Sequence, residues 1–510
     1  MNLRSLSIAF FFVLVFPILA KRPNILVILT DDHRYDALGF LGHPFLKTPH
    51  MDRLAAEGVH FQNAYVTTSL CSPSRASILT GLYAHNHRVV DNYNPVNKSL
   101  TFFPELLQGA GYQTAFIGKW HMGDSEEKQR GFDYWLSFKG QGVYVPDPAL
   151  LKAKGRFVPQ ATNSGFNING KRFAQKGYIT DELTDYAEEW LGGKDDTKPF
   201  LLYISHKGVH ADFLPPDRHA FKYDEVLIPT PPTPLSNPDL FKDPPMWVQN
   251  QSNSRHGVEF AYYTGVDMKK YYRRYCEALL AVDDSVGRLL DNLEKSGELE
   301  ETVILYLGDN GFIFGEHGLI DKRCAYDESI RIPMLMRYPK SLKPGTKVKK
   351  IVANIDVAPT LLEVAGLKPK ERMDGKSFWQ LAKGKGTSDW RKYLLYEYYW
   401  ERNYPQTPTN HAVIGEDYKY IRYHGVWDQD ELYNTKSDPK ERKNLFNDSS
   451  QESRINEMNE ALFNLLADSS GENMPLLRDR GVKYLHRKSG GSRGADFPPV
   501  FRRDAGTSGK

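Results

Sequence analysis

Two long apolar segments that run into polar residues place the strongest constraint on the fold. They are residues 24–30 (NILVILT) and 302–308 (TVILYLG), and the polar residues that follow them are Asp31, Asp32, Asp309 and Asn310. Continuous runs of this length and composition are typical of strands buried on both faces, as in a parallel sheet. Ligands of open α/β sheets bind at the carboxyl ends of such strands. We therefore expect the four polar residues to contribute to a ligand site.

The rest of the chain alternates strand and helix patterns up to about residue 385. Further strands are predicted at 112–117 and 199–205, and helices at 48–58, 180–191 and 266–295. This alternation predicts an α/β fold, with a large, mostly parallel sheet flanked by helices. Beyond it lie short strand patterns at 393–399, 411–414 and 418–423, followed by a helical pattern at 450–467. They predict a smaller C-terminal α+β subdomain on an antiparallel sheet.

Length and composition set the expected domains. A chain of 510 residues exceeds one typical core, so we expect a larger domain at 21–385 and the subdomain at 386–487. The Gly/Arg/Ser-rich residues 488–510 are expected to be disordered. The net charge of +3, without a basic stripe interleaved with aromatics, gives no reason to expect a nucleic-acid partner.

The N-terminus resembles an export signal. Arg4 precedes an apolar run at 8–20, so residues 1–20 are predicted to be a signal peptide with cleavage after Ala20. Ile18 is larger than the cleavage pattern prefers, which leaves retention as an anchor as a second possibility. The run is short for a membrane span, so we expect a secreted or periplasmic protein without stable membrane association.

The cysteines do not form a disulfide framework. There are three, and a bridge between Cys276 and Cys324 is the one pairing that leaves Cys71 free. Cys71 shortly precedes Pro73, which suits the first turn of a helix, so we expect Cys71 just ahead of a helix start. Arg75 would add a cation there, which favours an anionic ligand and a reactive cysteine. A packed cysteine before an ordinary capped helix is the alternative.

The four polar residues after the two strands form an all-oxygen set. Such sets favour Ca²⁺ or Mg²⁺ over zinc, although each pair alone could also be a turn or a helix cap. Basic residues follow other predicted strands or loops: Lys119, His121, His206, His210, His317 and Lys322. A cation surrounded by basic side chains suits the binding of a tetrahedral oxyanion ester.

Three motifs together resemble a known family. Residues 69–81, which contain Cys71-Ser72-Pro73-Ser74-Arg75, resemble the signature of the type I sulfatases of the alkaline phosphatase superfamily. Residues 111–121 (GYQTAFIGKWH) resemble that family's second signature, and the segments 309–311, 315–318 and 321–323 its third block. The resemblance spans most of residues 22–480 and implies an alkaline phosphatase-like fold. It also implies that Cys71 is oxidised to formylglycine (3-oxoalanine) by a formylglycine-generating or anaerobic sulfatase-maturating enzyme.

The resemblance also implies roles for individual residues. One Ca²⁺ would be held by Asp31, Asp32, Asp309, Asn310 and the modified Cys71. The implied catalytic residues are Cys71, Arg75, Lys119, His121, His210 and Lys322. Lys119, His210 and Lys322 would bind the sulfate, and His121 would help to release it. The family often has Pro-His-x-Pro around the third histidine, whereas this chain has Gly208-Val209-His210-Ala211. His206 therefore stays a second candidate for substrate binding.

The segment around His85 resembles sulfatases that act on glycans, including N-acetylglucosamine-6-sulfatases. We therefore expect an enzyme that hydrolyses sulfate esters of a sulfated polysaccharide or oligosaccharide, with His85 as a further substrate-binding candidate. The sugar and its sulfate position cannot be read from the sequence. One alternative is a phosphonate monoester hydrolase or phosphodiesterase of the same superfamily. Another is an inactive glycan-binding homologue whose Cys71 stays unmodified.

Overall fold

The computed structural model describes residues 22–473, apart from 124, 148–164, 212, 250–253, 256–266, 387, 402–406 and 426–427. The predicted signal peptide at 1–20 and the predicted tail at 488–510 lie outside the described residues. So does the end of the predicted subdomain. Among the helices of the described part of the chain, none combines the length and apolarity that crossing a membrane requires.

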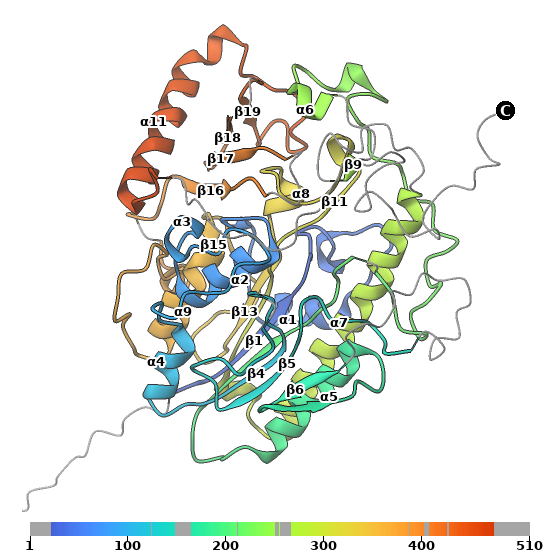
Figure 1. Ribbon diagram of the computed structural model, residues 1–510, viewed down its shortest axis with the longest axis vertical. Coiled ribbons are helices and arrows are strands. Elements are labelled where there is room, and N and C mark those ends of the chain that lie inside the picture. The colour runs from blue at the N-terminus through green and yellow to red at the C-terminus, as the bar shows by residue number, and fades with distance from the viewer. Residues whose placement is uncertain are drawn as a thin grey trace, which may run out of the picture.

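A ten-stranded sheet forms the centre of the molecule, and helices cover both of its faces (Figure 1). The strand order is β14-β2-β13-β10-β1-β8-β4-β5-β6-β7. The five inner strands, all parallel to one another, are β10 (Thr302–Gly308), β1 (Asn24–Thr30), β8 (Phe200–Ser205), β4 (Gln113–Lys119) and β5 (Tyr134–Phe138). The outer strands are β14 (Thr346–Val348), β2 (Val59–Phe61), β13 (Met334–Arg337), β6 (Phe166–Ile168) and β7 (Lys171–Phe173). Strand β13 runs antiparallel to β10, and β6 antiparallel to β5, so the mixed, mostly parallel sheet predicted from sequence is confirmed.

The alternating side chains of β1 separate two hydrophobic layers. Ile25, Val27 and Leu29 belong to the layer under α2 (Cys71–Thr80), α4 (Phe103–Gly109) and α9 (Val357–Val364). Leu26 and Ile28 belong to the layer under α1 (Pro49–Glu57), α5 (Ile179–Gly193) and α7 (Met268–Lys295). Because both faces are covered, the strand is apolar at every position, as the sequence indicated. The helix predicted at 266–295 is confirmed as α7, and its apolar residues Leu279, Val282 and Leu289 are buried in the second of these layers.

The C-terminal part is a four-stranded antiparallel sheet with one long helix packed on it. Its strands are β16 (Leu394–Tyr398), β17 (Thr409–Ile414), β18 (Tyr418–His424) and β19 (Glu431–Asn434). Helix α11 (Glu452–Ser469) contacts the first three. The predicted antiparallel α+β unit is therefore confirmed, with its helix shifted by two residues. The domain boundary near residue 385 stays a prediction.

The remaining described strands and α-helices are short. They are β3 (Ala64–Tyr65), β9 (Ser254–Arg255), β11 (Ile313–Phe314), β12 (Leu319–Asp321), β15 (Val352–Ala353), α3 (Ala84–His87), α6 (Met246–Gln249), α8 (Asp327–Ile330) and α10 (Trp379–Ala382). Cys276 and Cys324 are buried free thiols, so the bridge that the sequence allowed is not formed.

Candidate active site

The pairing of β1 with β10 brings the four polar residues together. Thr30 is paired with Gly308, so the next two residues of each strand emerge side by side at the carboxyl edge of the sheet. Their positions are linked by two hydrogen bonds: the Asp32 amide donates to Asp309 Oδ1 (3.0 Å), and Asn310 Nδ2 donates to Asp32 Oδ1 (2.6 Å). Asp31, Asp32, Asp309 and Asn310 are all fully buried.

The donor set fits a hard divalent cation. Asp31, Asp32 and Asp309 each offer a carboxylate oxygen, and these oxygens lie within 4.8 Å of one another. Among the described residues, the buried atoms Asp32 Oδ2 and Asn310 Oδ1 have no hydrogen-bond partner. Burial raises the pKa of Asp32 to about 7, because Lys322 offsets only part of the effect while Asp31 and Asp309 add to it. A bound Ca²⁺ or Mg²⁺, which prefers oxygen ligands, would be coordinated by the unpaired oxygens and would offset the charge of the clustered carboxylates.

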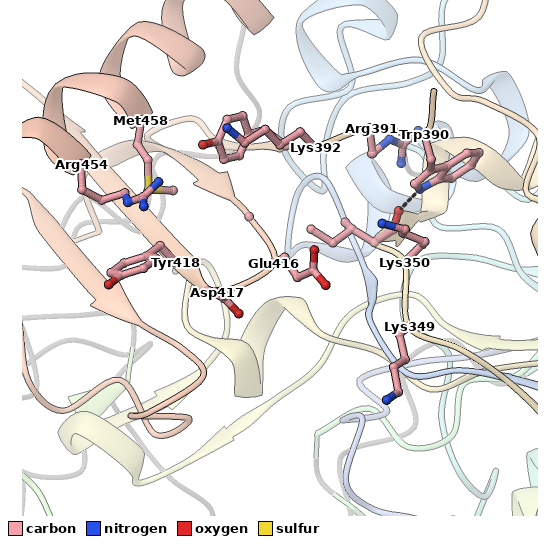
Figure 2. A pocket seen from close by; sticks show the side chains of 13 residues that line it. Lys349, Lys350, Trp390, Arg391, Lys392, Glu416, Asp417, Tyr418, Arg454 and Met458 are labelled. Atoms are coloured by element: carbon pink, nitrogen blue, oxygen red, sulfur yellow. Dashed lines mark hydrogen bonds between the residues drawn. The ribbon is translucent and has the colours of Figure 1, made fainter. Parts of the chain in front are cut away.

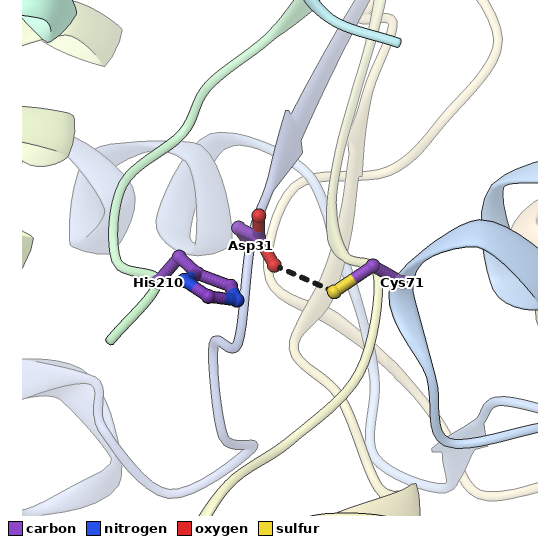
Figure 3. Close-up of side chains that lie close together, drawn as sticks. All are labelled: Asp31, Cys71 and His210. Atoms are coloured by element: carbon purple, nitrogen blue, oxygen red, sulfur yellow. Dashed lines mark hydrogen bonds between the residues drawn. The ribbon is translucent and has the colours of Figure 1, made fainter. Parts of the chain in front are cut away.

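Cys71 lies beside this cluster, at the first residue of α2. The expectation that it precedes the helix is corrected: Leu70 is the N-cap, and Pro73 occupies the third position. Cys71 Sγ is 3.3 Å from both Asp31 Oδ1 and Lys322 Nζ. Figure 3 shows Cys71, Asp31 and His210 converging from three different segments of the chain. The helix start therefore points the cysteine into the acidic cluster.

The Cys71 thiol stays protonated in this position. Burial, together with the nearby Asp31 carboxylate, raises its pKa to about 12 although Lys119 and Lys322 oppose the shift. Thiolate, and not thiol, is the nucleophilic form of cysteine. The environment thus disfavours an unmodified Cys71 as the attacking group.

Arg75, one turn further along α2, ties the ends of four strands together. Its Nε donates to Asp309 Oδ2 (2.9 Å), and its Nη2 lies 3.6 Å from Asp31 Oδ2. Its Nη1 donates to the Lys119 carbonyl (2.7 Å) and to Ser205 Oγ (2.6 Å). Arg75 therefore compensates the carboxylate charges and fixes their positions.

Two lysines from different segments of the chain reach the cluster. Lys119 Nζ, at the end of β4, pairs with Asp31 and with Gln141 Oε1. Lys322 Nζ pairs with Asp32; although burial disfavours its charge, the carboxylates of Asp32, Asp321 and Asp31 raise its pKa well above the usual value. Asp321 and Arg323, the neighbours of Lys322, both have left-handed backbone conformations (φ 97° and 81°), so Lys322 projects from a strained loop.

Gly118 allows the Lys119 end of β4 to approach β8 closely. Its φ is +120°, and a Cβ atom there would collide with the Ser205 carbonyl oxygen. Gln141 was missed by the sequence analysis because it lies in a Gly-rich stretch without periodicity, where no local pattern marks it as part of the site.

His121 and His210 complete the group around Cys71. His121 is buried with φ 56°, and its Nδ1 has no hydrogen-bond partner among the described residues. His210 Nε2 lies 4.0 Å from Asp32 Oδ2, and its side chain is 19% exposed. Burial is the main cause that holds the pKa of both imidazoles well below the usual value, and the nearby Lys119 charge is the second. His210 is therefore the histidine of this group that faces solvent.

The other two candidate histidines have different surroundings. His206 is fully buried and its Nε2 pairs with Ser285 Oγ of α7 (3.1 Å); burial lowers its pKa to about 3. His85 pairs through Nδ1 with Glu397 (2.7 Å) and through Nε2 with the Ser469 carbonyl (3.1 Å). Both ring nitrogens of His85 are thus occupied by residues of the C-terminal unit, one in β16 and one at the end of α11, which leaves neither for substrate. Of the two histidines after β8, the geometry favours His210.

This distinction predicts different effects of two substitutions. His210→Ala is expected to lower kcat/KM roughly 10²- to 10³-fold, as for loss of a proton-transfer group, with an unchanged melting temperature. His206→Ala is expected to change kcat/KM less than about 10-fold and to lower the melting temperature, because it empties a fully buried position. Steady-state kinetics and thermal unfolding of both variants provide the test, and a reversed order would assign the substrate position to His206.

Comparison with known proteins agrees with this geometry. Residues 23–367 match the family model described as Sulfatase, and residues 315–468 match N-sulphoglucosamine sulphohydrolase, C-terminal. An N-acetylglucosamine-6-O-sulfatase of Bacteroides thetaiotaomicron is 35% identical over 486 residues, which cover 84% of this chain and 83% of that protein. The human N-acetylglucosamine-6-sulfatase is 31% identical over 411 residues, with 76% and 69% covered. A solved structure of a protein in complex with its substrate D-glucosamine-2-N,6-O-disulfate superposes with a TM-score of 0.80 and 30% identity, covering 89% of this chain and 99% of that one.

Proposed function

The chain belongs to the sulfatase family and is a sulfuric ester hydrolase, and from this we propose that it removes the 6-O-sulfate from N-acetylglucosamine units of a sulfated glycan. The observation that carries the proposal is the convergence of buried carboxylates, two lysines and His210 on Cys71. The choice of sugar is supported by the relatives described as N-acetylglucosamine-6-sulfatases and by the disulfated glucosamine bound in the similar solved structure. We further propose that residues 1–20 export the protein.

We propose that the cation is Ca²⁺, held by Asp31, Asp32, Asp309, Asn310 and the modified Cys71. A bound divalent cation lowers the pKa of a coordinated hydroxyl and stabilises developing negative charge. We also propose that Cys71 is converted to formylglycine, which requires a formylglycine-generating or anaerobic sulfatase-maturating enzyme as partner. This conversion replaces a thiol that its surroundings keep protonated with a hydrated aldehyde, which supplies an oxygen nucleophile.

The basic side chains then have separate tasks. Lys322, in contact with Cys71, and Lys119, paired with Asp31, would hold sulfate oxygens. His210 is placed to give a proton from its ring to the leaving alcohol, and an adjacent bound sulfate favours its protonated form. His121 Nδ1, which has no partner among the described residues, is placed to accept a proton when sulfate is released.

The charge balance of the cluster suits a singly charged ester. The three carboxylates, Asp31, Asp32 and Asp309, are matched by three cations, Arg75, Lys119 and Lys322. A divalent cation would leave two positive charges in a buried site. A sulfate monoester and an ionised nucleophile bring one negative charge each, whereas a doubly charged phosphate monoester brings one too many. Singly charged phosphonate monoesters and phosphodiesters are not separated by this argument, so the test must include them.

Turnover of defined esters by the matured enzyme tests the proposal. N-acetylglucosamine 6-sulfate is expected to give a kcat/KM at least about 100-fold above that of its 3-sulfate isomer, because correct placement of the sulfur is worth several kcal/mol in the transition state. An aryl phosphonate monoester and an aryl phosphodiester serve as controls. Faster turnover of either than of every sulfate ester would contradict the proposal. Mass spectrometry of the Cys71 peptide from the native host, if it showed thiol alone, would favour the inactive glycan-binding alternative.

A further inference from the structure

A cavity of about 330 Å³ lies between the C-terminal sheet and the larger unit of the protein (Figure 2). It is formed by the link between β14 and β15, the segment that precedes β16, the turn between β17 and β18, and the first half of α11. Its polar and aromatic lining residues are Lys349, Lys350, Trp390, Arg391, Lys392, Tyr393, Glu416, Asp417, Tyr418 and Arg454. None of them belongs to the cluster around Cys71.

The strand β16 separates this cavity from the active site. The strand begins at Leu394, directly after the cavity residue Tyr393, and ends at Tyr398. Three residues later, Glu401 pairs with Arg323, the neighbour of Lys322 (2.8 Å). A five-residue strand spans roughly 16 Å. The cavity therefore lies at the end of the C-terminal sheet remote from the active site.

Positive charge exceeds negative charge around the cavity. Glu457, outside the lining, accepts from both Lys392 (2.7 Å) and Arg454 (2.6 Å), so one carboxylate serves two cations. Lys349 and Lys350 are exposed, and neither forms an ion pair within the described ranges. Arg391 is neutralised by Asp356. Figure 2 shows Arg454 and Lys350 on opposite sides of the cavity, with Glu416 on the turn between them.

Aromatic rings stand among these charges in fixed orientations. The indole N–H of Trp390 donates to the Ile351 carbonyl (2.7 Å), as Figure 2 shows, which holds the ring at the cavity wall. Arg454 lies over Tyr418, with 4.9 Å from its guanidinium carbon to the ring centroid. Arg391 and Lys392 lie over the Trp390 and Tyr393 rings in the same way, so cations stand at the ring faces, and cations of this kind pair with sulfate groups. A volume above 300 Å³ is in the range of ligand sites.

We propose that this cavity is a secondary binding site for a sulfated saccharide chain, which holds polymeric substrate while another part of the chain occupies the active site. The proposal rests on the proposed function in taking its ligand from the substrate class of the enzyme. A second contact on one polymer makes binding at the active site effectively intramolecular, so it lowers KM for polymers and leaves KM for monosaccharides unchanged. Lys350 and Arg454 would contact sulfate groups, and Glu416 would oppose them.

Binding measurements on charge variants test this proposal. In a Cys71→Ala background, isothermal titration with a heparin octasaccharide is expected to show about fivefold weaker binding for Lys350→Ala/Arg454→Ala, from the loss of two exposed charge contacts. Glu416→Gln is expected to strengthen binding about twofold, because it removes a repulsive charge. Lys368→Ala, an exposed lysine that does not line the cavity, serves as the matched control, and uncharged dextran controls for packing alone.

Kinetics of the charge variants with intact Cys71 complete the test. The double variant is expected to raise KM for a sulfated polymer and to leave kcat and KM for N-acetylglucosamine 6-sulfate unchanged. Unchanged octasaccharide affinity in the double variant, or an equal loss in Lys368→Ala, would overturn the proposal. If the double variant fails to fold, the octasaccharide affinity of Glu416→Gln, a substitution on an exposed turn, decides the question. Tighter binding supports the proposal, and unchanged or weaker binding overturns it. If no sulfate ester is turned over at all, the proposed function fails, whereas the binding series still decides this site.

Discussion

Replacing Cys71 with alanine is expected to lower kcat for sulfate-ester hydrolysis by at least about 10⁴-fold, the scale of losing a covalent nucleophile. The physical reason is the position of the side chain, with Sγ 3.3 Å from both Asp31 Oδ1 and Lys322 Nζ. No other cysteine lies in the cluster, since Cys276 and Cys324 are elsewhere in the described structure. The measurement is single-turnover and steady-state hydrolysis of N-acetylglucosamine 6-sulfate and of an aryl sulfate.

The fold is expected to survive this substitution. Alanine favours helices, the N-cap at Leu70 uses backbone groups, and the C-cap Gly81 stays in its left-handed conformation. The melting temperature of Cys71→Ala should therefore stay within a few degrees of the parent. Cys276→Ala removes another fully buried thiol, on α7, and provides the matched control, with near-parental activity. Residual activity of Cys71→Ala close to the parental level would refute Cys71 as the source of the nucleophile.

The part of the site that the sequence predicts best is the acidic cluster, and the reason is local. Apolar runs at 24–30 and 302–308 mark central strands, and the carboxyl ends of parallel neighbours meet at one edge of a sheet. The residues that follow them must therefore emerge together, and the observed register places Thr30 beside Gly308. The same logic predicts Lys119, since β4 runs parallel to β8, the strand next to β1.

The parts that the sequence predicts poorly depend on contacts between distant segments. Nothing near His85 in sequence reveals that Glu397 and Ser469 occupy its two ring nitrogens. His206 and His210 lie four residues apart in the sequence. Only the folded structure distinguishes them, because Ser285 of α7 pairs with His206. Gln141 approaches Lys119 from a stretch without periodicity. In each case the residue that contacts the site residue belongs to a distant segment of the chain, and local sequence patterns do not show such contacts.

Removing divalent cations is expected to lower sulfatase activity more than about 100-fold and to lower the melting temperature, with Ca²⁺ restoring both. Burial is the main cause that raises the pKa of Asp309, and repulsion from Asp31 is the second. The pKa of Asp32 is raised as well. Arg75, Lys119 and Lys322 offset these carboxylate charges, but burial still raises the pKa of Asp32 and Asp309, so a bound divalent cation is expected to stabilise the folded state further. A cation present at 100 times its Kd adds about 2.7 kcal/mol to the free energy of unfolding.

Chelation with EDTA, metal analysis and thermal unfolding measure these effects. Asp309→Asn is expected to weaken the response to Ca²⁺, because it removes one of the clustered carboxylates and the partner of Arg75. Asp291→Asn, at a side chain that is 57% exposed, is the matched control and should leave the response unchanged. Full activity in protein shown to be free of metal would contradict the assignment of the cluster. If activity and melting temperature both depend on the same cation, one site explains both effects. The charge that would stabilise the nucleophile also reduces the repulsion between the buried carboxylates at these strand ends.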